Sequence, residues 1–67
     1  MDEALMTTRQ AADFLGVKET TLEQWRWNGK GPEFCKLNRA VRYRRSAVDA
    51  FANARTFTST TEAQAAA

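Results

Sequence analysis

The stretch AADFLGVKETTLEQW, residues 11–25, decides the fold of this chain. Apolar residues recur in it at helical spacing on both sides of one glycine: Ala11, Phe14 and Leu15 before Gly16, and Val17, Leu22 and Trp25 after it. Glycine adopts the left-handed conformation that ends a helix at little cost. The stretch therefore predicts two short helices, residues 8–15 and 19–28, joined by a tight turn.

Capping signals indicate where these two helices begin. Thr7 and Gln10 have the Thr-x-x-Gln spacing of a capping box, which starts the first helix at residue 8. The second helix has two candidate starts, because Lys18 occupies the expected cap position while Thr20 and Glu23 form another capping box two residues later. Both starts keep the apolar residues on one side of the helix, and the Asn-Gly pair at 28–29 ends it.

A β-hairpin is predicted after the Gly-Pro pair at 31–32, which breaks the helix. Its strands are residues 34–37 and 41–44, and residues 38–40 connect them. Side chains alternate between the two faces of a strand. We expect an apolar face with Cys35, Leu37, Val41 and Tyr43, and a cationic face with Lys36, Arg42 and Arg44.

A third helix is predicted over residues 47–54, with Ser46 and Asp49 as its capping pair. Its buried residues would be Val48, Phe51 and Ala52. From residue 56 onward the sequence is low in complexity and poor in large apolar residues, which predicts a disordered tail over residues 56–67. Residues 1–55 then form one domain, with residues 1–6 as its lead-in. Its fold class is mainly α with a small β-hairpin, a winged helix-turn-helix.

A domain of this size needs its large side chains inside. We therefore assign four of them to the core: Phe14, Leu22, Trp25 and Phe51. The single cysteine, Cys35, is expected to be a small core hydrophobe. Trp27 has two interpretations, of which packing against the hairpin is favoured over stacking beside a sugar-phosphate backbone.

The composition excludes several classes of protein. The 67 residues contain one cysteine and no histidine, so they offer no intramolecular disulfide and no metal-binding spacing. No apolar run approaches the roughly 18 residues of a membrane span, and the acidic start is unlike a signal peptide. The chain has no catalytic pair and no glycine-rich phosphate loop. We expect a soluble intracellular protein that is not an enzyme and has no metal, cofactor or small-molecule substrate.

Basic residues gather in one part of the chain. The net charge is only +2, but residues 26–45 hold seven basic residues and a single acidic one, a local charge of +6. Clustering of one sign supplies a surface that can bind phosphates, although solvated faces of small domains also carry such charges.

Residues 5–55 resemble the excisionase and AlpA-like group of small winged helix-turn-helix domains, which are related to the DNA-binding heads of MerR-type regulators. The resemblance rests on these residues: Thr7, the pair 11–12, Leu-Gly-Val at 15–17, the pairs 21–22 and 25–26, Gly-Lys-Gly-Pro at 29–32, the run 37–44, and Val-Asp-Ala-Phe at 48–51. Two positions depart from the pattern of the family. Lys18 replaces a capping serine, and Asn38 replaces a glycine that is common in the hairpin turn.

The resemblance implies that the second helix enters the major groove of DNA and that the hairpin, as the wing, follows the adjacent minor groove or backbone. The residues that would approach base edges are Lys18, Glu19, Thr20, Glu23 and Gln24. The residues that would contact DNA from the wing and its flank are Lys36, Arg39, Arg42, Arg44 and Arg45.

The same resemblance implies a sequence-specific double-stranded DNA-binding protein of the excisionase type, in the cytoplasm of a bacterium or encoded by a phage or mobile element. Its partners would be double-stranded DNA, a site-specific integrase, and further copies of a chain that is monomeric in solution. An AlpA-like transcriptional regulator of a mobile element is the alternative. A more remote alternative is a protein-interaction module on the same fold.

Overall fold

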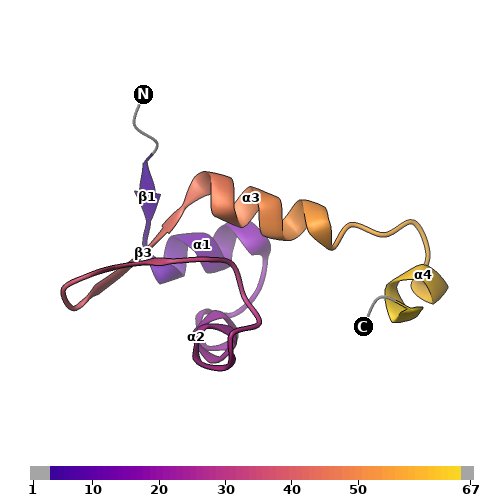
Figure 1. Cartoon of the computed structure of the whole chain (residues 1–67), viewed down its shortest axis with the longest axis horizontal. Coiled ribbons are helices and arrows are strands. Elements are labelled where there is room, and N and C mark those ends of the chain that lie inside the picture. The colour runs from indigo at the N-terminus through magenta and orange to yellow at the C-terminus, as the bar shows by residue number, and fades with distance from the viewer. Residues whose placement is uncertain (1–3, 66–67) are drawn as a thin grey trace.

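The computed structural model describes residues 4–65. The chain forms four helices and a small sheet, and the last helix is set apart from the other elements at the C-terminal end (Figure 1). In chain order the elements are β1 (Leu5–Met6), α1 (Thr8–Leu15), α2 (Glu19–Asn28), β2 (Cys35–Leu37), β3 (Ala40–Arg44), α3 (Arg45–Ala54) and α4 (Thr60–Ala65). Residues 1–3 of the predicted lead-in lie outside the described part.

The caps of α1 and α2 confirm most of the predicted helix ends. The Thr7 hydroxyl accepts a 3.1 Å hydrogen bond from the Gln10 backbone N–H, and the Gln10 side chain accepts one of 2.9 Å from the Thr7 N–H. Gly16 ends α1 and Gly29 ends α2, both with positive φ angles, of 72° and 74°. Helix α2 starts at Glu19, with Lys18 as its cap and no side-chain hydrogen bond there. The alternative start at Thr20 is excluded.

The sheet has three strands in the order β1-β3-β2, all antiparallel. The strand β1 was not predicted, because two residues are too short to show an alternating pattern. Met6 lies opposite Tyr43 in this sheet and packs against the core. Leu5 and Met6 are therefore tied to the domain by strand pairing.

The register of the hairpin corrects its predicted faces. Strand β3 begins at Ala40, which pairs with Leu37, so the turn contains two residues instead of three. A shift of one residue moves the side chains of one strand to the opposite face. Lys36 consequently lies opposite Val41, and Cys35 lies opposite Arg42. The hairpin has no separate apolar and cationic faces, because each face carries both kinds of side chain.

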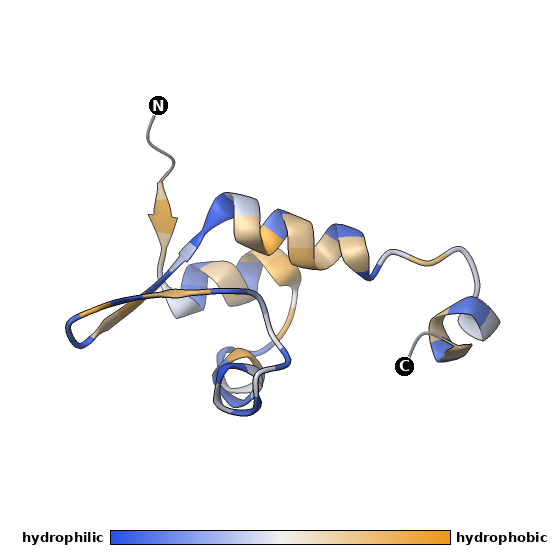
Figure 2. Ribbon diagram, viewed as in Figure 1, coloured by the Kyte–Doolittle hydropathy of each residue, from blue (hydrophilic) through white to orange (hydrophobic). Residues whose placement is uncertain are grey.

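The core lies where α1, α2, α3 and β3 meet, and α1 packs against both other helices (Figure 1). Figure 2 shows hydrophobic segments of α1 and α3 facing each other. The buried residues that form the core cluster are Ala11, Ala12, Leu22, Tyr43 and Val48, and partly buried hydrophobic side chains packed on them are Met6, Leu15, Val17, Trp25 and Val41. Two alanines on α1 let its neighbours approach closely, which explains how so few large side chains fill the centre.

Several predicted core positions are wrong. Phe14 is 43% exposed, because the buried arc of α1 follows the two alanines and leaves Phe14 at its edge. Trp27 is 88% exposed and does not pack against the hairpin. Cys35 is only half-buried, since the register places it opposite Arg42 and not on the face of Val41 and Tyr43, which pack in the core. Trp25 and Phe51, also predicted to be core residues, are only half-buried, and their ring centroids lie 5.6 Å apart.

The start of α3 also differs from the prediction. The helix begins at Arg45, directly after β3, and its cap residue Arg44 makes no side-chain capping bond. Ser46 lies inside the first turn and is not the cap. Pairing of Arg44 with Leu5 keeps the strand intact up to the helix, so the Ser-x-x-Asp pattern begins two residues after the actual cap.

Beyond α3, a short helix, α4, occupies residues 60–65. The sequence predicted no helix there. Figure 1 shows it apart from the other elements, at the end of an extended segment. The assignment of residues 56–67 to a tail outside the domain stays a prediction.

Candidate nucleic-acid interface

The first two turns of α2 present a polar surface to solvent. The five residues predicted to approach bases are all exposed there: Lys18, Glu19, Thr20, Glu23 and Gln24. Three of them, Thr20, Glu23 and Gln24, have the i, i+3, i+4 spacing of one helix face. On the opposite side, Leu22 is fully buried. The helix thus offers one face to the core and another to a ligand.

The side chain of Arg26 fixes this helix to the rest of the fold. Its Nη1 donates a 3.0 Å hydrogen bond to the Tyr43 hydroxyl on β3 and a 3.3 Å bond to the Thr8 hydroxyl on α1. The guanidinium carbon also lies 5.7 Å from the centroid of the Phe34 ring. Because these contacts come from three parts of the chain, the exposed face of α2 is held in a defined orientation to the hairpin.

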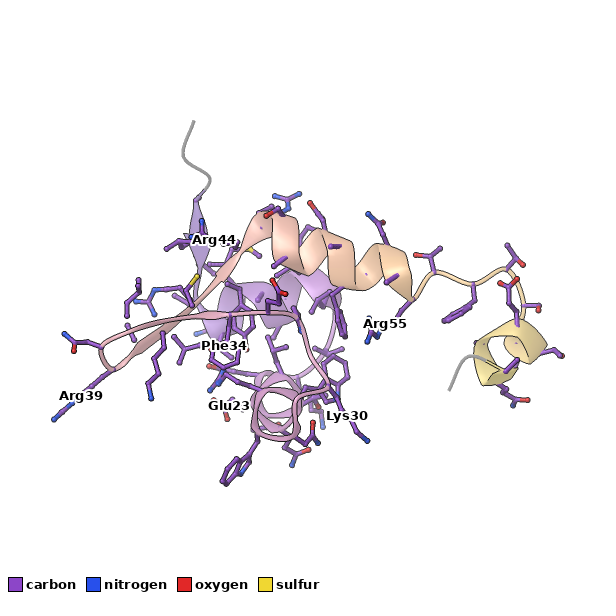
Figure 3. The ribbon with its side chains drawn as sticks, viewed as in Figure 1. Glu23, Lys30, Phe34, Arg39, Arg44 and Arg55 are labelled. Atoms are coloured by element: carbon purple, nitrogen blue, oxygen red, sulfur yellow. The ribbon has the colours of Figure 1, made fainter. Side chains whose placement is uncertain are left out.

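The hairpin distributes its cations over three places. Lys36 shares a face with Val41, on the side of the hairpin toward α2. Figure 3 shows Arg39 at the tip and Arg44 at the far end, beside α3. Arg42 and Arg44 lie on the other face, as their pairing with Cys35 and Leu5 requires. The structure therefore brings Lys36, and not the whole predicted set, next to α2.

Two of the predicted cations are engaged by the protein itself. The Arg42 guanidinium donates a 2.8 Å hydrogen bond to the Val41 carbonyl. Arg45 lies 3.5 Å from the Asp49 carboxylate, measured from Nε to Oδ2, and 4.4 Å from the centroid of Phe14. Arg45 therefore contacts α1 and α3, whereas Lys36, Arg39 and Arg44 extend from the hairpin into solvent.

Three further residues lie beside α2: Arg26 and Phe34, which were missed as candidates, and Trp27, for which packing was favoured over a DNA contact. Together with Glu23, Lys36 and Val41 they line a groove of about 470 Å³ between α2 and the hairpin. The sequence left stacking beside a sugar-phosphate backbone open for Trp27, which follows Glu23 by four residues and Gln24 by three and so continues the exposed face of the helix. No pattern in the sequence indicates the contacts of Arg26, because they join residues 17 and 18 positions apart.

The described residues contain no group of three or more histidine, cysteine or acidic side chains that could hold a metal. Among the helices of residues 4–65, none is long and apolar enough to cross a membrane.

The chain was compared with protein families and with curated proteins, and the family comparison supports a helix-turn-helix fold. No curated protein matches the chain. A family model described as a helix-turn-helix domain matches residues 5–56, which cover α1, α2, the hairpin and α3. Such a domain implies DNA binding, and the family is typically non-enzymatic. The chain belongs to this helix-turn-helix family, which contains the excisionase and AlpA-like small DNA-binding proteins.

Proposed function

We propose that the chain is a sequence-specific double-stranded DNA-binding protein that acts as an excisionase. It would bind repeated sites at an attachment region, bend the DNA, and direct a site-specific integrase toward excision. The observation that carries the DNA-binding part is the exposed polar face of α2 beside a basic hairpin, with α2 anchored through Leu22 and Arg26. The excisionase part is supported by the resemblance of residues 5–55 and by the membership of the family.

The side chains on α2 suit contacts with base edges in the major groove. Glutamine pairs bidentately with adenine, glutamate accepts a hydrogen bond from the cytosine amino group, and the threonine methyl group meets the thymine methyl group. Gln24, Glu23 and Thr20 supply these three chemistries on one face. The two carboxylates on this helix repel phosphates, so α2 contributes more to sequence discrimination than to affinity.

The hairpin supplies the affinity. Lys36, Arg39 and Arg44 are exposed, and Arg42 is half-buried next to them. Arginine and lysine neutralise phosphates and release counterions, and arginine also enters narrow minor grooves. Such contacts fix the position of a protein on the duplex and carry little sequence information. We assign the hairpin to the backbone or minor groove next to the site of α2.

The excisionase role is tested in two steps. A target is first selected from random duplexes with the full chain, and footprinting then locates it on the DNA that flanks the gene. An excision assay with the cognate integrase follows, and a circular-permutation gel measures the bend. Protection at the attachment site with stimulated excision supports the proposal.

Each other result has its own meaning. Protection at a promoter without any effect on excision would replace the excisionase by an AlpA-like transcriptional regulator. Negligible affinity for duplex DNA at low salt, unchanged by Arg39→Ala, would instead favour a protein-interaction module. The salt dependence of binding is therefore measured before the excision assay.

A further inference from the structure

The groove between α2 and the hairpin, lined by Glu23, Arg26, Trp27, Phe34, Lys36 and Val41, is unusual in its chemistry. It combines two cations with three apolar side chains, and its lone carboxylate belongs to the helix. Figure 3 shows Glu23 and Phe34 next to each other in this region, between α2 and the strand segment above it. We call it the α2–hairpin groove.

The cation on the helix side of the groove is preorganised. Both hydrogen bonds of Arg26 to Thr8 and Tyr43 use Nη1, and Tyr43 is fully buried. A guanidinium carries further donors on Nε and Nη2. Within residues 4–65 these donors form no hydrogen bond, so they are available to a ligand whose anionic oxygens enter the groove. A fixed guanidinium loses little conformational entropy when it binds such a group.

The cation on the hairpin side is Lys36. Its pairing with Val41 places it on the face of the hairpin that looks toward α2. The groove therefore has one cation on each wall, Arg26 from the helix and Lys36 from the strand. Glu23 lines the groove as well, on the wall formed by α2.

Trp27 completes the groove on its outer edge. It is the most exposed of the large hydrophobic residues of the described part, at 88%. Its place on the helix continues the face of Glu23 and Gln24, away from Leu22. An indole offers a flat apolar surface and one N–H donor. Such a side chain suits a ligand that is part sugar ring and part charged group.

We propose that the α2–hairpin groove binds the sugar-phosphate backbone of one DNA strand, with Arg26 and Lys36 on a phosphate and Trp27 against the adjoining deoxyribose. This inference rests on the proposed function and adds residues to it. When α2 occupies the major groove and the hairpin the neighbouring minor groove, the strand that separates the two grooves passes between the two elements. Backbone contacts carry no sequence information, so the groove contributes affinity and register for every duplex.

The experiment compares the full chain with Trp27→Ala, Trp27→Phe and Lys36→Ala on the selected target and on random duplex. Because Trp27 and Lys36 are exposed, these variants keep the fold, which circular dichroism checks. Trp27→Ala is expected to weaken binding of both duplexes by about fivefold, the lower end of the effect of removing an aromatic contact to nucleic acid. Lys36→Ala is expected to lower the slope of log affinity against log salt by about 1.

Two further measurements locate the contact. The fluorescence difference between the wild-type chain and Trp27→Phe isolates the signal of Trp27 from that of Trp25, and DNA is expected to shield it from acrylamide. Ethylation of the phosphate that Lys36 contacts is expected to weaken binding by the wild-type chain. Ethylation of the same phosphate should not weaken binding by Lys36→Ala, which has already lost the contact.

The failure of this inference is distinct from that of the proposed function. If the wild-type chain binds duplex DNA while Trp27 stays open to acrylamide and Trp27→Ala binds normally, the groove is not a backbone site. A loss confined to the target duplex would make Trp27 a base contact and overturn the inference. Equal shielding of Trp27 by polyglutamate at the same ionic strength would make the groove a site for acidic peptides. Absence of any duplex binding by the wild-type chain would instead refute the proposed function.

Discussion

The Arg26 guanidinium on α2 donates a 3.0 Å hydrogen bond to the hydroxyl of Tyr43 on β3. Tyr43 is fully buried, so its hydroxyl is a fixed acceptor. The Arg26 side chain thus extends from α2 to β3, the central strand of the sheet. The relative orientation of the two elements assigned to DNA depends on this contact.

Tyr43→Phe is expected to lower the free energy of unfolding by about 1 kcal/mol, because it removes one hydrogen bond and keeps the packing of the ring. This expected loss is small for a hydrogen bond to a charged group, because Arg26 is only half-buried and solvent screens its charge. Urea denaturation followed by tryptophan fluorescence measures the change. Thr8→Val removes the longer bond at 3.3 Å and serves as the matched variant, with a smaller expected loss. Identical stability of Tyr43→Phe and the wild-type chain would mean that the bond does not stabilise the fold.

Gln24→Ala and Thr20→Ala test base recognition. Each is expected to reduce the discrimination between target and random duplex by about 1–3 kcal/mol if the side chain contacts a base directly. Both residues are exposed on α2, so stability should not change. Competition binding at one fixed salt concentration measures the difference.

Arg39→Ala is the matched control for these two variants. Arg39 lies at the tip of the hairpin, far from the exposed polar face of α2 (Figure 3). Its loss is expected to weaken target and random duplex together and to lower the salt slope by about 1. A loss by Gln24→Ala that is equal on both duplexes would show that Gln24 reads no base.

Lys18 is a weak cap for α2. It has the extended backbone of a cap residue, with φ −74° and ψ 148°, but makes no side-chain bond to the first turn. Lys18→Ser is therefore expected to stabilise the chain by about 0.5–1 kcal/mol relative to Lys18→Ala, which is the control for the lost charge. Thermal unfolding of the two variants checks this, and equal midpoints would show that serine forms no cap here.

Local signals in the sequence were sufficient for much of the fold. The capping box at Thr7 and the two helix-ending glycines depend on residues within one turn of each other, and they predicted both ends of α1 and the end of α2, whose start was left between two candidates. The exposed face of α2 followed from the same periodicity. These features could be predicted because short-range hydrogen bonds and backbone preferences determine them.

Long-range contacts determine what could not be predicted. The strand β1 and the start of α3 depend on the pairing of Leu5 with Arg44. The contacts of Arg26 depend on the packing of three elements. A turn one residue shorter than expected exchanged the faces of one strand, so the sequence placed Lys36 on one face with Arg42 and Arg44, whereas it lies opposite Val41 and lines the groove.

Asn38 tests the importance of this turn. Among the described residues, Asn38 is the one non-glycine residue whose φ angle is positive, at 60°. Asparagine tolerates this conformation, whereas alanine does so at a cost of about 1 kcal/mol. Asn38→Ala is expected to destabilise the chain by that amount, and Asn38→Gly to leave stability nearly unchanged. Urea denaturation measures both. Equal effects of alanine and glycine would mean that the side chain, and not the backbone angle, is what the turn requires.

Arg45 was a candidate for DNA contact, and its surroundings suggest a different role. Its guanidinium lies over Phe14, which the buried arc of α1 leaves exposed, and next to the Asp49 carboxylate. An exposed cation–π contact contributes about 0.5–1 kcal/mol and a surface ion pair about as much or less. Arg45→Ala is therefore expected to lower the free energy of unfolding by about 0.5–1 kcal/mol and to leave the salt slope of DNA binding unchanged. Arg39→Ala is measured in the same experiment for comparison. An arginine that neutralises a phosphate releases counterions when it binds, so a fall of about 1 in the salt slope of Arg45→Ala would show that Arg45 contacts DNA after all.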